Sequence, residues 1–176
     1  MAPVPQVYAV VLGPEGGHLS WTCRGDGVLL MFMTKTSFYD ADELFTPMLM
    51  TKYVLRNMLL HGARGSIVHV SSISAHTGYK GLAMYASSKG AIEAFSKNTA
   101  REWGPRGVRS NVVVPGFMET AMSASLSGEQ KSRIYRRTSL KSATSISSVA
   151  ATVAFLLSEG ASSITGQAVH VDCGTI

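Results

Sequence analysis

Lys89 follows Tyr85 by four positions, and Ser72 precedes the tyrosine by thirteen. If residues 82–102 are helical, positions i and i+4 share one face, so the phenol and the ammonium lie side by side. A nearby cation lowers the pKa of a tyrosine, ordinarily about 10, toward neutral pH. The pair could therefore exchange a proton, and Ser72 could hold the oxygen atom that takes part.

Alternating strands and helices must place these three residues. A β-rich run at 66–71 leads to Ser72, and the helix 82–102 stops at Gly104-Pro105. The strands are apolar rather than strictly alternating, which is typical of a parallel sheet covered on both faces. We therefore predict an α/β fold with a Rossmann-like, doubly wound parallel sheet. The other predicted strands are 7–12, 108–114 and 168–172, and the other predicted helices are 40–60, 127–137 and 148–157.

Two of the earlier segments have a specific ambiguity or interruption. Residues 28–33 are apolar and could form a strand or begin a helix, since periodicity cannot separate the two at this length. The helix at 40–60 contains Pro47, so we expect a break there, with Thr46 as the N-cap.

Composition indicates one globular domain. The 176 residues are 45% hydrophobic and 15% charged, and two cysteines are too few for a disulfide framework. No apolar run is long enough to cross a membrane, and we expect a cytoplasmic protein with no metal site. The net charge is +5, but the basic residues are spread out, so we expect no nucleic-acid partner. The one basic cluster, read as a solvated helix face, is Lys131, Arg133, Arg136 and Arg137.

Three segments around this motif follow in a fixed order: 66–73, 111–120 with its Pro-Gly, and 164–174 at the end of the chain. Together with the serine, tyrosine and lysine, they resemble the classical short-chain dehydrogenase/reductase family, particularly its 3-oxoacyl-[acyl-carrier-protein] reductase and carbonyl reductase members. The resemblance covers residues 48–176.

This resemblance implies roles for the three residues. Tyr85 would be the acid or base that exchanges a proton with the substrate oxygen. Lys89 would lower the pKa of the tyrosine and donate a hydrogen bond to the ribose of NADP or NAD. Ser72 would hold the carbonyl of a small-molecule substrate.

The resemblance also implies the rest of the cofactor site. Pro115 and Gly116 would turn the chain at the carboxyl end of a strand, the usual ligand edge of such a sheet. The backbone of Met118 and the hydroxyl of Thr120 would face the nicotinamide amide and the phosphate. Cys173 stands where the family usually has a glycine, and we expect it to pack as a small apolar group.

The N-terminal part departs from the family. Only 84 residues precede Tyr85, too few for a full dinucleotide-binding half, so residues 1–47 are interpreted as a degenerate remnant and 48–176 as the catalytic and C-terminal half. The family's glycine-rich phosphate motif is matched only by Gly13 and Gly17.

Three functions remain open. The first is NAD(P)-dependent reduction of a ketone or 3-oxoacyl group, or oxidation of the alcohol. The second is a cofactor-independent proton-transfer enzyme, such as an isomerase, dehydratase or cyclase. The third is a non-catalytic truncated paralogue or splice product that associates with full-length relatives.

Two further expectations concern surfaces. The helix of Tyr85 and Lys89 carries a face of small residues, so we expect a homo-oligomer formed through it. His76, in the loop after the serine strand, could contact substrate, although a loop histidine without a carboxylate partner is more often solvated.

Overall fold

The computed structural model describes residues 8–12, 22–23, 28–32, 42–62, 64–120 and 123–176. These residues form a six-stranded sheet in the order β2-β1-β3-β4-β5-β6. All neighbouring strands are parallel except β2, which runs antiparallel to β1. The strands are β1 (Tyr8–Leu12), β2 (Thr22–Cys23), β3 (Val28–Phe32), β4 (Gly65–Val70), β5 (Val108–Pro115) and β6 (Ala168–Val171).

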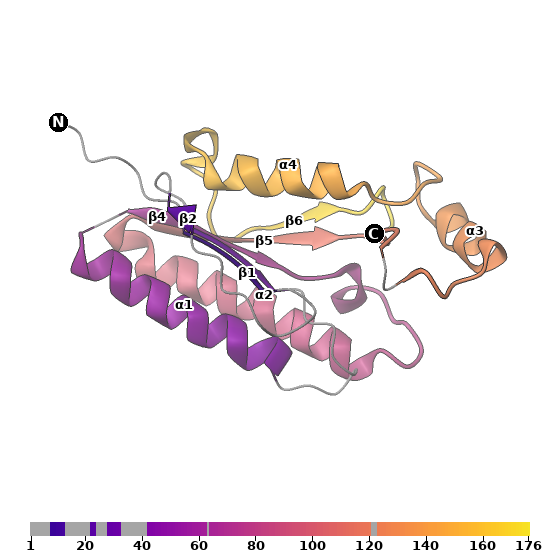
Figure 1. The fold of residues 1–176 in the computed structure, drawn as a ribbon, viewed down its shortest axis with the longest axis horizontal. Helices are drawn as coiled ribbons and strands as arrows, with labels where there is room; N and C mark the ends of the chain where they lie inside the picture. The colour runs from indigo at the N-terminus through magenta and orange to yellow at the C-terminus, as the bar shows by residue number, and fades with distance from the viewer. Residues whose placement is uncertain (1–7, 13–21, 24–27, 33–41, 63, 121–122) are drawn as a thin grey trace.

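Helices cover both faces of the sheet, which confirms the doubly wound α/β fold (Figure 1). Helices α1 and α2 lie on one face and α4 on the other, while α3 projects at one end. The helices are α1 (Asp42–Leu60), α2 (Ala83–Trp103), α3 (Gly128–Arg137) and α4 (Ile146–Leu157), with short 3-10 turns η1 (Ile73–Ala75), η2 (Gly104–Arg106) and η4 (Glu159–Ala161).

The last crossover has the opposite hand to the two before it. Strands β3, β4, β5 and β6 follow one another across the sheet in chain order, all parallel. Because α1 and α2 lie on one face and α4 on the other, the β5-to-β6 connection winds in the other sense. Parallel crossovers share one hand almost without exception, so this connection is an unusual feature of the fold.

Strand β4 shows why the sheet needs cover on both sides. Ile67 packs against Val54 and Met58 of α1. The next residue, Val68, packs with Val153 and Leu156 of α4. Successive side chains of a strand point to opposite faces, so the apolar run predicted from the sequence is buried on both.

The same strand buries a histidine. His69 is 1% exposed, and its ring meets Phe95 edge to face with centroids 5.8 Å apart. Neither ring nitrogen has a hydrogen-bond partner in the part of the chain that the structure describes. Burial lowers the pKa of His69 from 6.5 to about 4, so the ring is neutral in the fold.

The expected break at Pro47 is wrong, because α1 continues through it from Asp42 to Leu60. Proline removes the bond that its missing N–H would make to the carbonyl one turn earlier and crowds that carbonyl, but Pro47 is only the sixth residue of the helix. In the following turn, the Thr51 hydroxyl donates to the Pro47 carbonyl at 2.7 Å, so this carbonyl has a partner. Thr46 therefore lies inside the helix and is not its N-cap.

Serine caps fix the start of two later helices. Ser127 caps α3: its hydroxyl accepts from the Gln130 N–H, while the Gln130 side chain accepts from the Ser127 N–H at 2.8 Å, a capping box. Ser145 caps α4 by accepting from the Ser148 N–H. Helix α4 therefore begins at Ile146, two residues before the predicted start.

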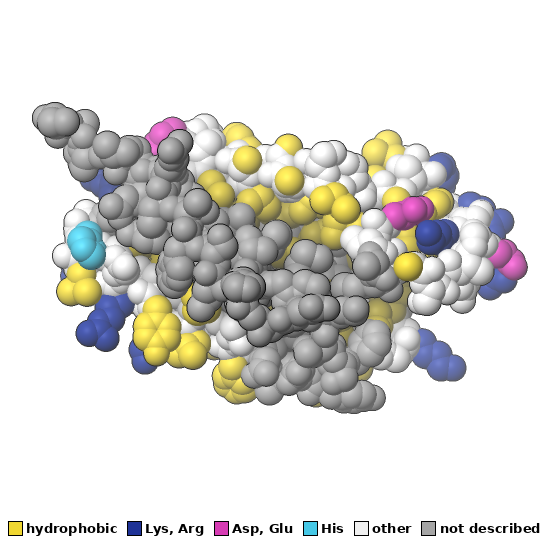
Figure 2. Space-filling model, in the orientation of Figure 1, with side chains coloured by type: hydrophobic (Ala, Val, Ile, Leu, Met, Phe, Trp, Pro, Cys, Tyr) yellow, Lys and Arg dark blue, Asp and Glu magenta, His cyan; other side chains and the backbone are white. Residues whose placement is uncertain are grey.

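The surface carries distinct patches. Figure 2 shows Lys and Arg side chains gathered around α3 and hydrophobic side chains beside α4.

Segment 28–33, which could be a strand or the start of a helix from the sequence, is a strand over Val28–Phe32. Within the described ranges, no helix has the length and apolar character needed to cross a membrane.

Candidate active site

Ser72 lies directly beyond the carboxyl end of β4. Its extended backbone makes it the N-cap of η1, and its hydroxyl accepts from the Ser74 N–H at 3.2 Å. The preceding residue still belongs to the sheet edge, since the Ser71 N–H donates to the Val113 carbonyl at 2.9 Å. The cap holds the Ser72 oxygen in place while a serine hydroxyl keeps one proton of its own to donate.

Tyr85 and Lys89 lie one turn apart on α2, as the i, i+4 spacing predicts. The Lys89 side chain is buried, and its Nζ lies 5.4 Å from the centroid of the Tyr85 ring, within the range of a cation–π contact. Tyr85 is half-buried. The ammonium therefore lies over the face of the phenol ring on one side of the helix.

Contacts through Ser71 join the end of β4 to α2. The Ser71 hydroxyl lies 3.2 Å from the Lys89 carbonyl and 2.5 Å from Oε1 of Glu93. The structure thus ties the strand end that leads to Ser72 to the helix that carries Tyr85 and Lys89.

Gly116 follows the last residue of β5 and packs tightly against the chain at the end of β6. Its N–H donates to the Val171 carbonyl at 2.9 Å. A Cβ at this position would lie 2.5 Å from Thr144 Oγ1 and 2.7 Å from the Cα of Asp172. Glycine follows the buried Pro115 because the neighbouring chain leaves no room for a side chain.

The segment after Gly116 is folded around one hydroxyl. Ser123 Oγ accepts from the Thr120 N–H at 2.9 Å and lies within hydrogen-bond distance of the Met118 and Thr120 carbonyls. The Met118 side chain packs against the core cluster that includes Val113. The Met118 carbonyl and both backbone polar groups of Thr120 therefore have partners within the loop, and the Met118 side chain packs in the core.

Comparisons with known proteins cover this part of the chain. The family described as Enoyl-(Acyl carrier protein) reductase matches residues 41–175. The chain is 37% identical to 3-oxoacyl-[acyl-carrier-protein] reductase FabG of Salmonella typhimurium over 148 residues, which are 83% of this chain and 60% of the relative.

The chain belongs to the short-chain dehydrogenase/reductase family. It is also 41% identical over 126 residues to FabG of Aquifex aeolicus, covering 72% of this chain and 50% of that protein. With carbonyl reductase [NADPH] 2 of Sus scrofa it shares 36% identity over 126 residues, 70% of this chain and 52% of the relative. The chain thus spans half to three fifths of the length of the curated relatives it matches.

The site residues predicted from the sequence did not include Glu119, an acidic residue in the loop after β5. Tyr135 of α3 donates a hydrogen bond to Glu119, and Lys131 Nζ lies 3.5 Å from the same carboxylate. The hydrogen bond from Tyr135, and then the charge of Lys131, lower the pKa of Glu119, while the same hydrogen bond raises the pKa of Tyr135. No local signal in the sequence pairs a glutamate with a tyrosine sixteen positions later across a loop.

The site residues predicted from the sequence did not include Asp172 either. Its buried carboxylate accepts from the N–H groups of Gly174, Thr175 and Ile176 at 2.9–3.0 Å. Cys173, half-buried between them, has a φ of +57°, a conformation that favours glycine. These bonds fix the segment that packs on Gly116.

The two predicted phosphate-binding glycines, Gly13 and Gly17, lie outside the described residues. In the described part of the chain, no group of three or more His, Cys, Asp or Glu side chains could hold a metal ion.

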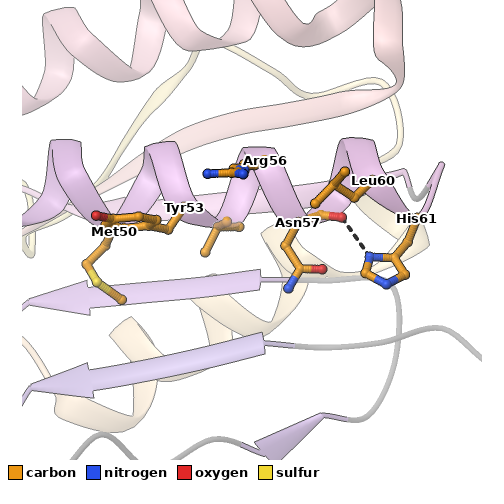
Figure 3. A pocket seen from close by; sticks show the side chains of 7 residues that line it. Met50, Tyr53, Arg56, Asn57, Leu60 and His61 are labelled. Carbon is orange, nitrogen blue, oxygen red and sulfur yellow. Dashed lines mark hydrogen bonds between the residues drawn. The ribbon is translucent and has the colours of Figure 1, made fainter.

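A surface pocket of about 340 Å³ follows α1 and does not belong to this site (Figure 3). His61 Nδ1 donates to the Asn57 carbonyl at 2.9 Å at its far end. Because α1 ends just before β4 begins, this end of the pocket lies at the amino edge of the sheet, opposite Ser72. The lining residues are Met50, Tyr53, Val54, Arg56, Asn57, Leu60 and His61.

Proposed function

We propose that this chain is an NAD(P)-dependent oxidoreductase that reduces a ketone or 3-oxoacyl group, or oxidises the corresponding alcohol. The observation that carries the proposal is the buried Lys89 ammonium 5.4 Å from the Tyr85 ring, on a helix joined to the strand end that leads to Ser72. Family membership and the activities printed in the names of the relatives support it.

Each of the three residues has a distinct role in this proposal. Tyr85 donates its phenolic proton to the substrate oxygen in reduction and takes it back in oxidation. Lys89 stabilises the phenolate left behind. Ser72 donates a hydrogen bond to the substrate oxygen. Its hydroxyl accepts from the Ser74 N–H and keeps its own proton for this bond. A bound nicotinamide would supply the hydride.

The carboxyl ends of β4 and β5 fit the nicotinamide end of such a cofactor. Ligands of open parallel sheets bind at this edge, where Ser72 and Gly116 both lie. We assign Pro115, Gly116, Met118 and Thr120 to the nicotinamide side of the site. Gly13 and Gly17 are proposed to approach the phosphates, with residues 1–47 as a remnant of the dinucleotide-binding half and 48–176 as the catalytic half.

We also propose a homo-oligomer formed through helices α1 and α2. Helix α1 exposes Phe45, Leu49 and Tyr53 along one stripe. A second surface pocket of about 350 Å³ lies between the two helices. An apolar stripe beside a groove is typical of a protein interface.

The proposed reaction is tested by turnover of a 3-oxoacyl thioester and of a simple ketone. The oxidation of NADPH or NADH is the measured signal. We expect Tyr85→Phe to lower kcat by at least about 100-fold, since it removes the proton donor without removing the ring. Tyr53→Phe, on the exposed side of α1, should leave kcat unchanged. Equal rates for the parent and Tyr85→Phe would contradict the proposal, and turnover without cofactor would favour the proton-transfer alternative.

A further inference from the structure

Glu93 connects α2 to both sides of Ser72. Its Oε1 lies 2.5 Å from the Ser71 hydroxyl and 3.0 Å from His76 Nε2. Ser71 immediately precedes Ser72, and His76 follows it at the end of η1. One carboxylate oxygen therefore holds the segment on both flanks of the proposed catalytic serine.

The position of Glu93 on α2 makes this contact relevant to the other two residues. It lies four positions after Lys89, so Tyr85, Lys89 and Glu93 follow one another at i, i+4 and i+8 on the helix. The Ser71 hydroxyl also lies 3.2 Å from the Lys89 carbonyl. The turn that carries Lys89 and the turn that carries Glu93 both contact the end of β4.

Burial and charge strengthen these bonds. The Glu93 side chain is 15% exposed and that of His76 is 32% exposed. A hydroxyl-to-carboxylate bond of 2.5 Å has the length of a charge-assisted hydrogen bond, which is about twice as strong as a neutral one. His76 also packs edge to face on His170 of β6, with ring centroids 4.7 Å apart. His76 is exposed, as expected of a loop histidine, but it has a carboxylate partner in Glu93.

We propose that Glu93 is a positioning residue that holds Ser72 against Tyr85 and Lys89, a proposal that rests on the proposed function. Glu93 acts through Ser71 and His76 and does not itself touch the substrate. A displacement of about 1 Å in a reacting group can lower a rate by about 100-fold, so a clamp of this kind determines kcat.

The geometry gives a matched pair of variants. Because both bonds reach the same oxygen, Glu93→Gln keeps an acceptor with two lone pairs and loses only the charge. Glu93→Ala loses both bonds. His76→Ala removes one flank at a partly exposed site, should the alanine variant at 93 fail to fold. Glu102→Ala removes an exposed glutamate from the same helix and serves as the control.

Amide hydrogen exchange of residues 71–79 tests the clamp without any need for turnover. We expect at least about tenfold faster exchange in Glu93→Ala and His76→Ala, a smaller increase in Glu93→Gln, which keeps the acceptor but loses the charge, and a rate within about twofold of the parent in Glu102→Ala. Equal exchange in all variants, or exchange in Glu93→Gln as fast as in Glu93→Ala, would overturn the proposal. A parent chain without turnover would contradict the proposed function, while the exchange result would still decide the clamp.

Kinetics then test the consequence for catalysis. In Glu93→Ala, kcat should fall by at least about tenfold while KM and the Kd of the cofactor change by less than about twofold, and kcat of Glu93→Gln should lie between those of Glu93→Ala and the parent. A general loss of folding would weaken cofactor binding as well. An unchanged kcat in Glu93→Ala, or an equal loss of cofactor affinity, would overturn the positioning role.

Discussion

At the scale of single residues, His69 couples stability to pH because its buried ring is neutral. The unfolded chain binds a proton with a pKa near 6.5, whereas the folded chain does so only near 4. Between these values the unfolded state binds more protons, so stability falls as the pH is lowered from 6.5 to 4. Integrated over this range, the loss is roughly 3 kcal/mol.

Urea unfolding at several pH values measures this effect against His69→Leu. We expect the free energy of unfolding of the parent to fall by roughly 3 kcal/mol more than that of the variant between pH 6.5 and 4. Parallel pH profiles for the two proteins would show that the ring is not held neutral.

Cys173 is a second residue in an unfavourable situation, because its backbone conformation is one that disfavours residues with a side chain. Its φ of +57° lies in the left-handed region, which costs an L-residue roughly 1–2 kcal/mol. Cys173→Gly should therefore raise the Tm by about 2–4 °C in a thermal melt. Cys173→Ala keeps the strained Cβ and should not raise it, so a glycine variant that melts below the alanine variant would contradict this explanation.

At the scale of elements, Glu119 fastens α3 to the loop that follows β5. Tyr135→Phe removes the hydrogen bond to Glu119 and should speed amide exchange over residues 128–137 while leaving the Tm nearly unchanged. Lowering the pH should likewise reduce the protection of these amides in the parent, measured relative to their intrinsic exchange rates at each pH. Because the pKa of Glu119 is depressed, the contact persists above the usual carboxyl range and is lost as the pH falls through the lowered value.

The matching control changes a different interaction of the same helix, α3. Arg133→Lys alters the exposed Arg133–Glu129 ion pair, whose N–O distance is 2.6 Å, and should leave the exchange of α3 close to that of the parent. Protection of α3 that is the same in Tyr135→Phe and in the parent would contradict the role of Glu119.

Elements with a local signal were predictable from the sequence. The apolar runs predicted β4 and β5, Gly104-Pro105 predicted the end of α2, and the predicted limits of α2 and α3 lie within a residue of those observed. Pro47 misled because its local preference opposes a helix that the neighbouring residues support. The i, i+4 geometry of Tyr85 and Lys89 was also predictable. The partners of Glu93, Glu119 and Asp172 were not, since loop contacts depend on tertiary packing rather than on spacing.

At the scale of the whole molecule, the chain spans half to three fifths of its curated relatives and exposes an apolar stripe on α1. If the chain is an oligomer through α1 and α2, light scattering coupled to size exclusion will give a mass at least twice 18.7 kDa. Leu49→Glu should reduce it to the monomer, because a charge on the stripe disfavours burial. Phe155→Glu on α4 is the control, and a monomeric parent would contradict the proposal.

The central claim is that Tyr85 and Lys89 still face a nicotinamide cofactor. Its most direct test is a titration of the purified chain with NADPH and NADH, followed by cofactor fluorescence and calorimetry. We expect saturable binding of at least one cofactor at micromolar concentration, weakened at least about tenfold by Lys89→Met and unchanged by Lys97→Met, an exposed lysine of the same helix. Failure of both cofactors to bind up to millimolar concentration would contradict the claim.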